Sequence, residues 1–138
     1  MKKPLYLLLI LIIASCSNIS KVQYPYTKIE SKTEIVGNNT NTMELYSTPN
    51  TLNLDTLKMF CKERRDNISS RTFYYLVFFD SKDNAVFPNN PLTALYGTDE
   101  KAQKHIRAYF EYNSLNGYSK LHVYETNSWE SKKTTFDL

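Results

Sequence analysis

The chain has 138 residues, with 17 lysines and arginines against 14 acidic residues, a formal net charge of +3. This length predicts one domain, and the small charge excess argues against a nucleic-acid-binding protein, which would carry a strongly basic surface. With only three glycines, the sequence shows no phosphate-binding glycine loop and no common hydrolase or zinc-protease motif. We therefore expect no cofactor and no nucleic-acid partner, and the sequence favours a function other than catalysis.

The first 15 residues are typical of a cleaved targeting segment. Met1-Lys2-Lys3 is a basic head, and the ten residues from Leu5 to Ala14 are all apolar. A membrane-spanning helix needs about 20 apolar residues, whereas the apolar region of a signal peptide runs about 7–15. Removal of residues 1–15 leaves 15 basic and 14 acidic residues. The mature chain is thus expected to be close to neutral.

The end of this apolar run, Ile13-Ala14-Ser15-Cys16, resembles the lipobox of bacterial lipoproteins. The resemblance implies that the Cys16 thiol carries a diacylglycerol, that the chain is cut before Cys16, and that the new amine is acylated. Two or more acyl chains hold a protein firmly at a membrane. In that class, a residue other than Asp after the cysteine, here Ser17, is compatible with the outer membrane. The alternative is an ordinary signal peptide with Cys16 near the mature start.

Residues 16–41 are polar and lack a regular apolar pattern, which predicts a lipidated N-terminus followed by a tether. Gly37–Asn41 then marks the expected start of a single domain over residues 42–138. With Cys16 lipidated, Cys61 is the one thiol left in this sequence, so no intramolecular disulfide is expected.

The domain begins with a short expected strand over residues 43–47, followed by the best helical pattern of the chain, about 53–66, with Asn53 as its N-cap. Residues 73–79, FYYLVFF, predict a central strand that is covered on both faces. A turn at 80–84, a short returning strand at 85–87 and a helical turn over 98–104 follow.

The clearest β pattern is a hairpin formed by residues 105–113 and 118–126. A two-residue type I′ loop at Asn116-Gly117 would place Phe110 opposite Val123, whereas a four-residue loop from Ser114 would shift every pair by two. Either register keeps the same two faces. Trp129 and Phe136 are expected to fold back onto the core. The predicted fold class is α+β, a four- to five-stranded, mostly antiparallel sheet with one main helix on one face.

Three groups of side chains invite a chemical interpretation. Glu111 and His122 could begin a metal site, but no third ligand is evident, and a cross-strand polar pair is favoured. Cys61 could be a nucleophile, but its position on the apolar helix stripe favours an inert core thiol. The acidic stretch 80–84 lacks the glycine and glutamate of a calcium loop, so a turn is favoured. No metal site is expected.

The aromatic content is the remaining clue, with eleven tyrosines and seven phenylalanines. Tyrosine is favoured at recognition surfaces because its ring packs and its hydroxyl hydrogen-bonds. The loop 87–97 is long and carries apolar residues, so it either contributes to a contact surface or packs over an open sheet face. The candidate binding surface comprises Asn89, Asn90, Tyr96, Tyr109, Tyr118 and Tyr124.

We therefore expect a lipid-anchored cell-envelope protein that binds a protein or another envelope macromolecule outside the cytoplasm. A more specific version is an immunity or inhibitor lipoprotein that blocks a toxin or hydrolase. A structural role in the envelope is a third possibility. A small envelope enzyme is the least favoured, and it would require convergence in one cleft of His105, Glu111, His122 or Cys61.

Overall fold

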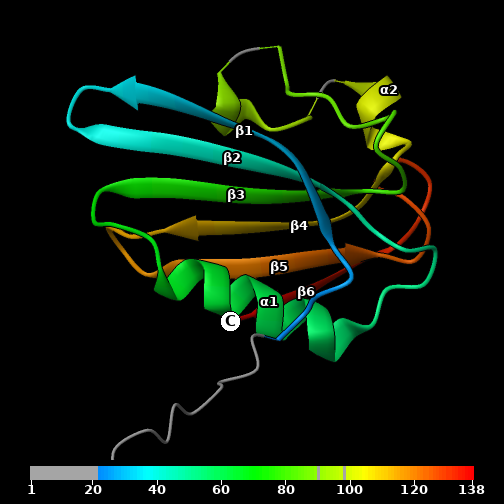
Figure 1. Cartoon of the computed structure of the whole chain (residues 1–138). Helices are drawn as coiled ribbons and strands as arrows, with labels where there is room; N and C mark the ends of the chain where they lie inside the picture. Colours follow the sequence, from blue (N-terminus) through cyan, green and yellow to red (C-terminus); the bar gives the residue numbers. More distant parts are fainter. Residues whose placement is uncertain (1–21, 90, 98) are drawn as a thin grey trace, which may run out of the picture.

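The computed structural model describes residues 22–89, 91–97 and 99–138, and within these ranges the chain forms one six-stranded sheet with one main helix (Figure 1). The strands lie in chain order, from β1 at one edge to β6 at the other. The elements are β1 (Thr27–Val36), β2 (Asn39–Ser47), α1 (Leu54–Asp66), β3 (Thr72–Phe79), the 3₁₀ turn η1 (Leu92–Ala94), α2 (Glu100–Gln103), β4 (Ile106–Asn113), β5 (Tyr118–Tyr124) and β6 (Lys133–Asp137).

The sheet is mixed. β2 and β3 pair in parallel, and every other neighbouring pair is antiparallel. Parallel neighbours need a crossover connection, and α1 lies within that connection. The predicted α+β class with one main helix is confirmed, but four to five strands is an undercount because the sequence reading missed β1 and β6. Both are edge strands with largely exposed side chains, so neither shows the apolar alternation of a half-buried strand.

The predicted tether over residues 16–41 is wrong for its second half. Residues 27–36 form β1 and residue 39 begins β2, with Gly37 at φ +61° in the tight turn between them. The segment before β1 is also packed. The Tyr24 hydroxyl donates to Glu63 Oε2 at 2.7 Å, and Tyr26 is buried. The predicted signal peptide and Cys16 lie outside the described residues.

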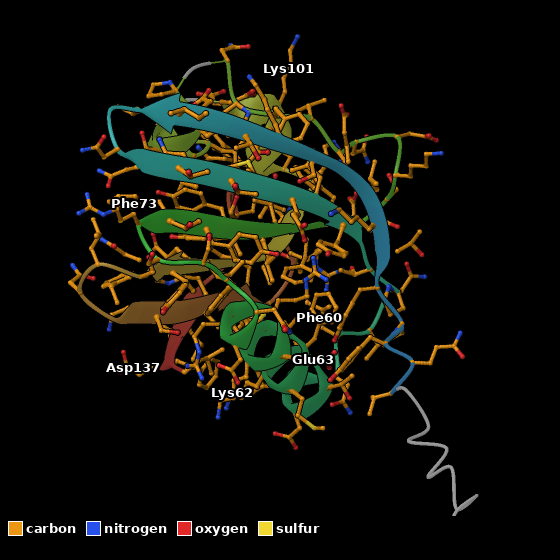
Figure 2. The ribbon with its side chains drawn as sticks, turned by 60° about the vertical axis from the view of Figure 1, so that its left-hand side comes forward. Phe60, Lys62, Glu63, Phe73, Lys101 and Asp137 are labelled. Atoms are coloured by element: carbon orange, nitrogen blue, oxygen red, sulfur yellow. The ribbon has the colours of Figure 1, made fainter. Side chains whose placement is uncertain are left out.

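The helix α1 forms where the sequence predicts it. The Asn53 side chain accepts a hydrogen bond from the Thr56 backbone N–H at 2.9 Å, which caps the first turn. Leu57, Phe60 and Cys61 are buried against the sheet, and Figure 2 shows Phe60 on the strand side of the helix. No helix in the described part of the chain is both long and apolar enough to cross a membrane.

The central strand β3 is buried on both faces, as predicted, because alternate side chains enter two different cores. Tyr74, Leu76 and Phe78 pack with α1, whereas Tyr75, Val77 and Phe79 belong to a second core on the opposite face. The Cys61 side chain is fully buried, and its burial raises the pKa of the thiol. The sheet therefore separates Cys61 from everything on the second face.

The segment between β3 and β4 covers part of that second face. Leu92 is fully buried and Tyr96 is 6% exposed, so both pack into the second core. The predicted returning strand at 85–87 is wrong, because these residues form no strand. The helical turn expected over 98–104 is present as α2, which Asp99 caps by accepting from the Ala102 N–H; Thr98 lies outside the described residues.

The β4–β5 hairpin has the four-residue loop rather than the two-residue one. Phe110 pairs with Leu121 and Asn113 with Tyr118. A type I′ loop needs positive φ at both central positions, but of the two only Gly117 adopts one, at +73°. Gly117 instead donates its N–H to Asn113 O at 2.9 Å. Phe136 packs on the α1-side core as expected, whereas Trp129 is 44% exposed, so that part of the expectation is wrong.

A buried ionic network joins α1 to the first three strands. The Glu44 carboxylate accepts hydrogen bonds from Arg64 Nη2, Tyr46 Oη and Tyr74 Oη, each at 2.7 Å, and from Lys28 Nζ at 2.5 Å. Burial alone would raise the pKa of Glu44, but these donors and the Arg64 charge lower it to about 2. The network holds the helix against the sheet, and the sequence reading missed it.

Candidate binding face

The face of the sheet opposite α1 is only partly covered, and the candidate site lies on its open part. We define the open face as the side chains of β3–β6 that point away from α1 and lie beyond the packed loop. Alternation along the strands identifies them. They comprise Phe73, Tyr75, Tyr109, Glu111, Asn113, Tyr118, Lys120, His122, Tyr124, Lys133, Thr135 and Asp137.

A cavity of about 260 Å³ lies where the loop meets the open face, and we call it the tyrosine pocket. Tyr109 and Tyr124 lie 6.3 Å apart between ring centroids on neighbouring strands. Tyr96 enters from the loop, with its ring edge-on to Phe79 at 5.9 Å and its hydroxyl donating to Val86 O. Burial raises the pKa of all three hydroxyls, so they are protonated at neutral pH.

The other walls of the tyrosine pocket are either apolar or formed by polar side chains that already hydrogen-bond within the protein. Val77, Leu95 and Ile106 supply aliphatic surface. Ser128 Oγ donates to Gln103 O at 2.8 Å, and Gln103 Nε2 donates to Tyr96 O. None of the described residues that line this pocket is charged. A cavity of this kind suits an uncharged, largely apolar group, because a charged one would lose its hydration without a partner.

The pocket wall also contains an unusual backbone. Leu95 has φ +50° and ψ −133°, a region that residues with a Cβ rarely adopt. Its N–H is satisfied by Leu92 O at 3.2 Å. Such conformations cost of order 1–3 kcal/mol and persist where the surroundings enforce them. The loop is therefore held in its shape by the buried Leu92 and Tyr96 on either side.

A second hollow of about 230 Å³ lies further along the same face, and we call it the Glu111 hollow. Phe73, Tyr75 and Tyr118 contribute aromatic walls, and Glu111 is among the lining residues. Glu111 Oε1 accepts from His122 Nε2 and from the Tyr118 hydroxyl, both at 2.9 Å. The His122 hydrogen bond is the main reason why the pKa of Glu111 is lowered, and it outweighs burial.

His122 connects the two hollows. The residue is 5% exposed, its ring lies 4.4 Å from that of Tyr109, and Nδ1 lies 2.8 Å from Thr135 Oγ1. Carboxylate, imidazole and hydroxyl stand here in the order of a catalytic triad. Thr135, however, lines neither of these two hollows, and it does not line the cavity between α1 and β5–β6. We interpret the arrangement as a hydrogen-bonded network between β4, β5 and β6 that positions the Glu111 carboxylate.

The structure brings together three of the candidate residues named from the sequence, Tyr96, Tyr109 and Tyr124. Tyr118 lies in the neighbouring Glu111 hollow. Asn89 is exposed and lines neither hollow, and Asn90 lies outside the described residues. In the loop 87–97, Leu92 and Tyr96 pack into the second core, and the loop also supplies one wall of the tyrosine pocket.

The convergence required by the enzyme hypothesis is not found. His105 Nδ1 is paired with Asp80 Oδ2 at 2.9 Å, and Cys61 lies on the α1 side of the sheet. Within the described ranges, no three His, Cys, Asp or Glu side chains are grouped to share a metal ion. The Glu111–His122 pair expected from the sequence is present, although Glu111 lies opposite Lys120 in the strand register.

Sequence reasoning missed the two aromatic walls that β3 contributes to the Glu111 hollow. Phe73 and Tyr75 alternate with Tyr74 and Leu76, so this alternation could have assigned them to the face opposite α1.

No protein family, curated protein or solved structure matches the chain in comparisons with known proteins.

Proposed function

We propose that this chain is a lipid-anchored cell-envelope protein whose domain binds a protein or another envelope macromolecule through the open face. The observation that carries the proposal is the convergence of Tyr96, Tyr109 and Tyr124 on one uncharged cavity, on a sheet face that the rest of the fold leaves partly open. Interfaces are built around aromatic anchors in well-packed pockets. The tyrosine pocket has this character.

The size of the tyrosine pocket favours an apolar side chain as its occupant. An apolar cavity of about 150 Å³ can accommodate benzene, and the tyrosine pocket has about 260 Å³. A leucine or phenylalanine side chain of a partner would therefore fit. The Tyr109 and Tyr124 hydroxyls allow the rim to hydrogen-bond the partner's backbone or to remain hydrated, whereas the Tyr96 hydroxyl already donates to Val86 O.

The proposed anchor is compatible with an accessible open face. Six residue steps separate Cys16 from Val22, which span at most about 20 Å when fully extended. After Val22 the chain is fastened to α1 by Tyr24 and Tyr26, and Figure 1 shows this segment passing beside α1. An acylated Cys16 would thus hold the α1 side near the lipid, with the open face turned away from it.

Labelling with a fatty-acid analogue tests the anchor. The wild-type chain should incorporate the label and fractionate with membranes, the outer membrane in a diderm host. Cys16→Ala should abolish both. Incorporation of label by the Cys16→Ala chain would contradict the proposed lipid site. A Cys61→Ala chain is the matched control, because it removes the other cysteine and should still be labelled.

Crosslinking in intact cells, followed by mass spectrometry, tests the binding function. The wild-type chain should capture a specific partner, and Tyr124→Ala should reduce that capture while the protein remains folded. Met59→Ala is the control, because Met59 is 56% exposed on α1, away from the open face. Equal capture by wild type and Tyr124→Ala would exclude the tyrosine pocket as the binding site. A captured enzyme that loses activity in the complex would support the immunity or inhibitor version.

A further inference from the structure

The Glu111 hollow is chemically unlike the tyrosine pocket beside it, because it contains a carboxylate. The Glu111 side chain is 22% exposed, so one edge of it faces solvent. Its pKa is lowered, chiefly by the hydrogen bond from His122. The carboxylate is therefore ionised at neutral pH, within a hollow that also has aromatic walls.

The hydrogen bonds of Glu111 leave one oxygen available. His122 Nε2 and the Tyr118 hydroxyl both donate to Oε1, and no donor from the described part of the chain is recorded on Oε2. An ionised carboxylate can accept up to about four hydrogen bonds. A ligand could thus donate a hydrogen bond to Glu111 Oε2 without breaking a contact within the protein.

The aromatic walls favour a positive charge in the same place. Ring faces carry negative electrostatic potential, and cations within about 6 Å of a ring centroid are attracted. One cation–π contact is already present within the protein, because Lys120 Nζ lies 5.6 Å from the centroid of the Tyr118 ring. Phe73 and Tyr75 add two further rings from β3, and Figure 2 shows Phe73 toward the same end of the molecule as Asp137.

The cations nearest to Glu111 are not bonded to it. Lys120 lies opposite Glu111 in the strand register, but its ammonium is held by Asp137 Oδ1 at 2.6 Å. Lys133, on β6, attracts the carboxylate from a distance and contributes least to its lowered pKa. Because Asp137 holds the Lys120 ammonium, Lys120 does not neutralise the negative charge of the Glu111 carboxylate.

We propose that the Glu111 hollow binds a cationic nitrogen group, an ammonium or guanidinium, through Glu111 Oε2 and the rings of Phe73, Tyr75 and Tyr118. This inference deepens the proposed function and rests on it where the cation belongs to a partner protein. Tyr109 and Glu111 are two residues apart on one strand face, about 7 Å. An extended partner segment could therefore place an apolar residue in the tyrosine pocket and, two residues along, a lysine or arginine at Glu111.

Binding can be measured by NMR titration of the full chain, purified as expressed in a non-ionic detergent. The probes are methylammonium, whose N–H groups can donate to Glu111 Oε2, methanol as an uncharged analogue of similar size, and a short peptide containing one lysine. The cationic probes should shift the Tyr118 and His122 side-chain signals in a saturable manner, and the uncharged analogue should not. Absence of saturable shifts with both cationic probes would overturn the proposal.

Two variants separate the roles of charge and ring. Glu111→Gln keeps the shape and an acceptor for His122 but removes the charge, and it should weaken cation binding about tenfold or more. Tyr118→Phe keeps the ring and should retain binding within about threefold, because a cation–π contact does not need the hydroxyl. Unchanged affinity in a folded Glu111→Gln protein would contradict the proposal.

The probes also distinguish the source of the cation. Tighter binding of the lysine peptide than of methylammonium supports a partner side chain, and the reverse order supports a free organic ammonium. This result can be separated from that of the Tyr124 crosslinking experiment. If the protein captures a partner through Tyr124 but binds no cation, only the cation site proposed for the Glu111 hollow is contradicted. If it binds cations but captures no partner, the proposed binding of a macromolecule is contradicted instead.

Discussion

His122 and Glu111 are joined by a 2.9 Å hydrogen bond between Nε2 and Oε1, although the strand register places Lys120, not His122, opposite Glu111. The contact is diagonal, and it turns the carboxylate along the sheet. His122 is held from its other side by Thr135 and by the Tyr109 ring. The buried His122 imidazole thus positions the carboxylate that lines the Glu111 hollow.

Replacement of His122 by alanine should destabilise the protein by about 1–3 kcal/mol, because Glu111 loses its main donor within a partly buried site. The lowered pKa of Glu111 stabilises the fold above the ordinary carboxylate pKa of 4.5, and this contribution is lost as the pH falls. His122→Ala should therefore lose more stability relative to wild type at pH 7 than at acidic pH. Urea unfolding at both values measures this, and an equal loss at both would contradict the role assigned to the hydrogen bond.

Glu44 should be the larger electrostatic contributor to stability. Glu44→Gln leaves Arg64 and Lys28 without their buried partner, so we expect a loss of roughly 3 kcal/mol at pH 7. The pKa of Glu44 is lowered from 4.5 to about 2, so its contribution is present above pH 4.5 and declines as the pH falls toward 2. Chemical denaturation across this range should show a steeper decline for wild type than for Glu44→Gln.

Glu63→Gln is the matched control for that series, because Glu63 is exposed and, among the described residues, its carboxylate binds only the Tyr24 hydroxyl. It should cost no more than about 1 kcal/mol. Comparable losses for Glu44→Gln and Glu63→Gln would show that the buried network does not have the stabilising role assigned to it.

Tyr96 should matter for the loop, whereas Asn89 should not. Tyr96→Ala removes a ring that is 6% exposed and packed on Phe79, so we expect a loss of about 3 kcal/mol or more. Asn89→Ala changes an exposed side chain and should be within about 0.5 kcal/mol of wild type. Thermal unfolding distinguishes the two. An unfolding temperature unchanged by Tyr96→Ala would mean that the loop does not depend on this ring.

Asp137 should control access of cations to the Glu111 hollow. Asp137→Asn weakens the hold on Lys120, whose ammonium lies 2.6 Å from Asp137 Oδ1. The freed ammonium can then turn toward Glu111 and compete with the probe. Binding of methylammonium should weaken severalfold, and Lys120→Met in the same background should restore it. Affinity unchanged by Asp137→Asn would refute this role of the Asp137–Lys120 pair.

The sequence was most informative where local and long-range forces agree. Asn53 caps α1 and the apolar stripe at Leu57 and Cys61 faces the sheet, so propensity, capping and burial all predicted the same helix. Strand β3 was recognisable because both of its faces are apolar. The edge strand β1 was not, since an edge strand is polar for the same reason that a tether is polar, namely exposure to water.

The sequence predicted residue types for the candidate site but not its geometry. It identified Tyr109 and Tyr124 on one hairpin face, and period-2 alternation is sufficient for that. It could not place Tyr96 against them, because that position depends on the fold of the segment between β3 and β4. Nor could it predict the diagonal His122–Glu111 contact, because the loop length that sets the register depends on the backbone angles of Asn116 and Gly117.

Site-specific photocrosslinking in intact cells tests the central claim, binding through the open face, most directly. A photoreactive phenylalanine analogue is placed at Tyr124 on the open face or at Met59 on the opposite side of the sheet. We predict a discrete adduct from position 124 that disappears when Tyr109 is also changed to alanine, and no adduct of that size from position 59. The same adduct from both positions, or an adduct from position 59 alone, would contradict the assignment of the open face as the binding surface.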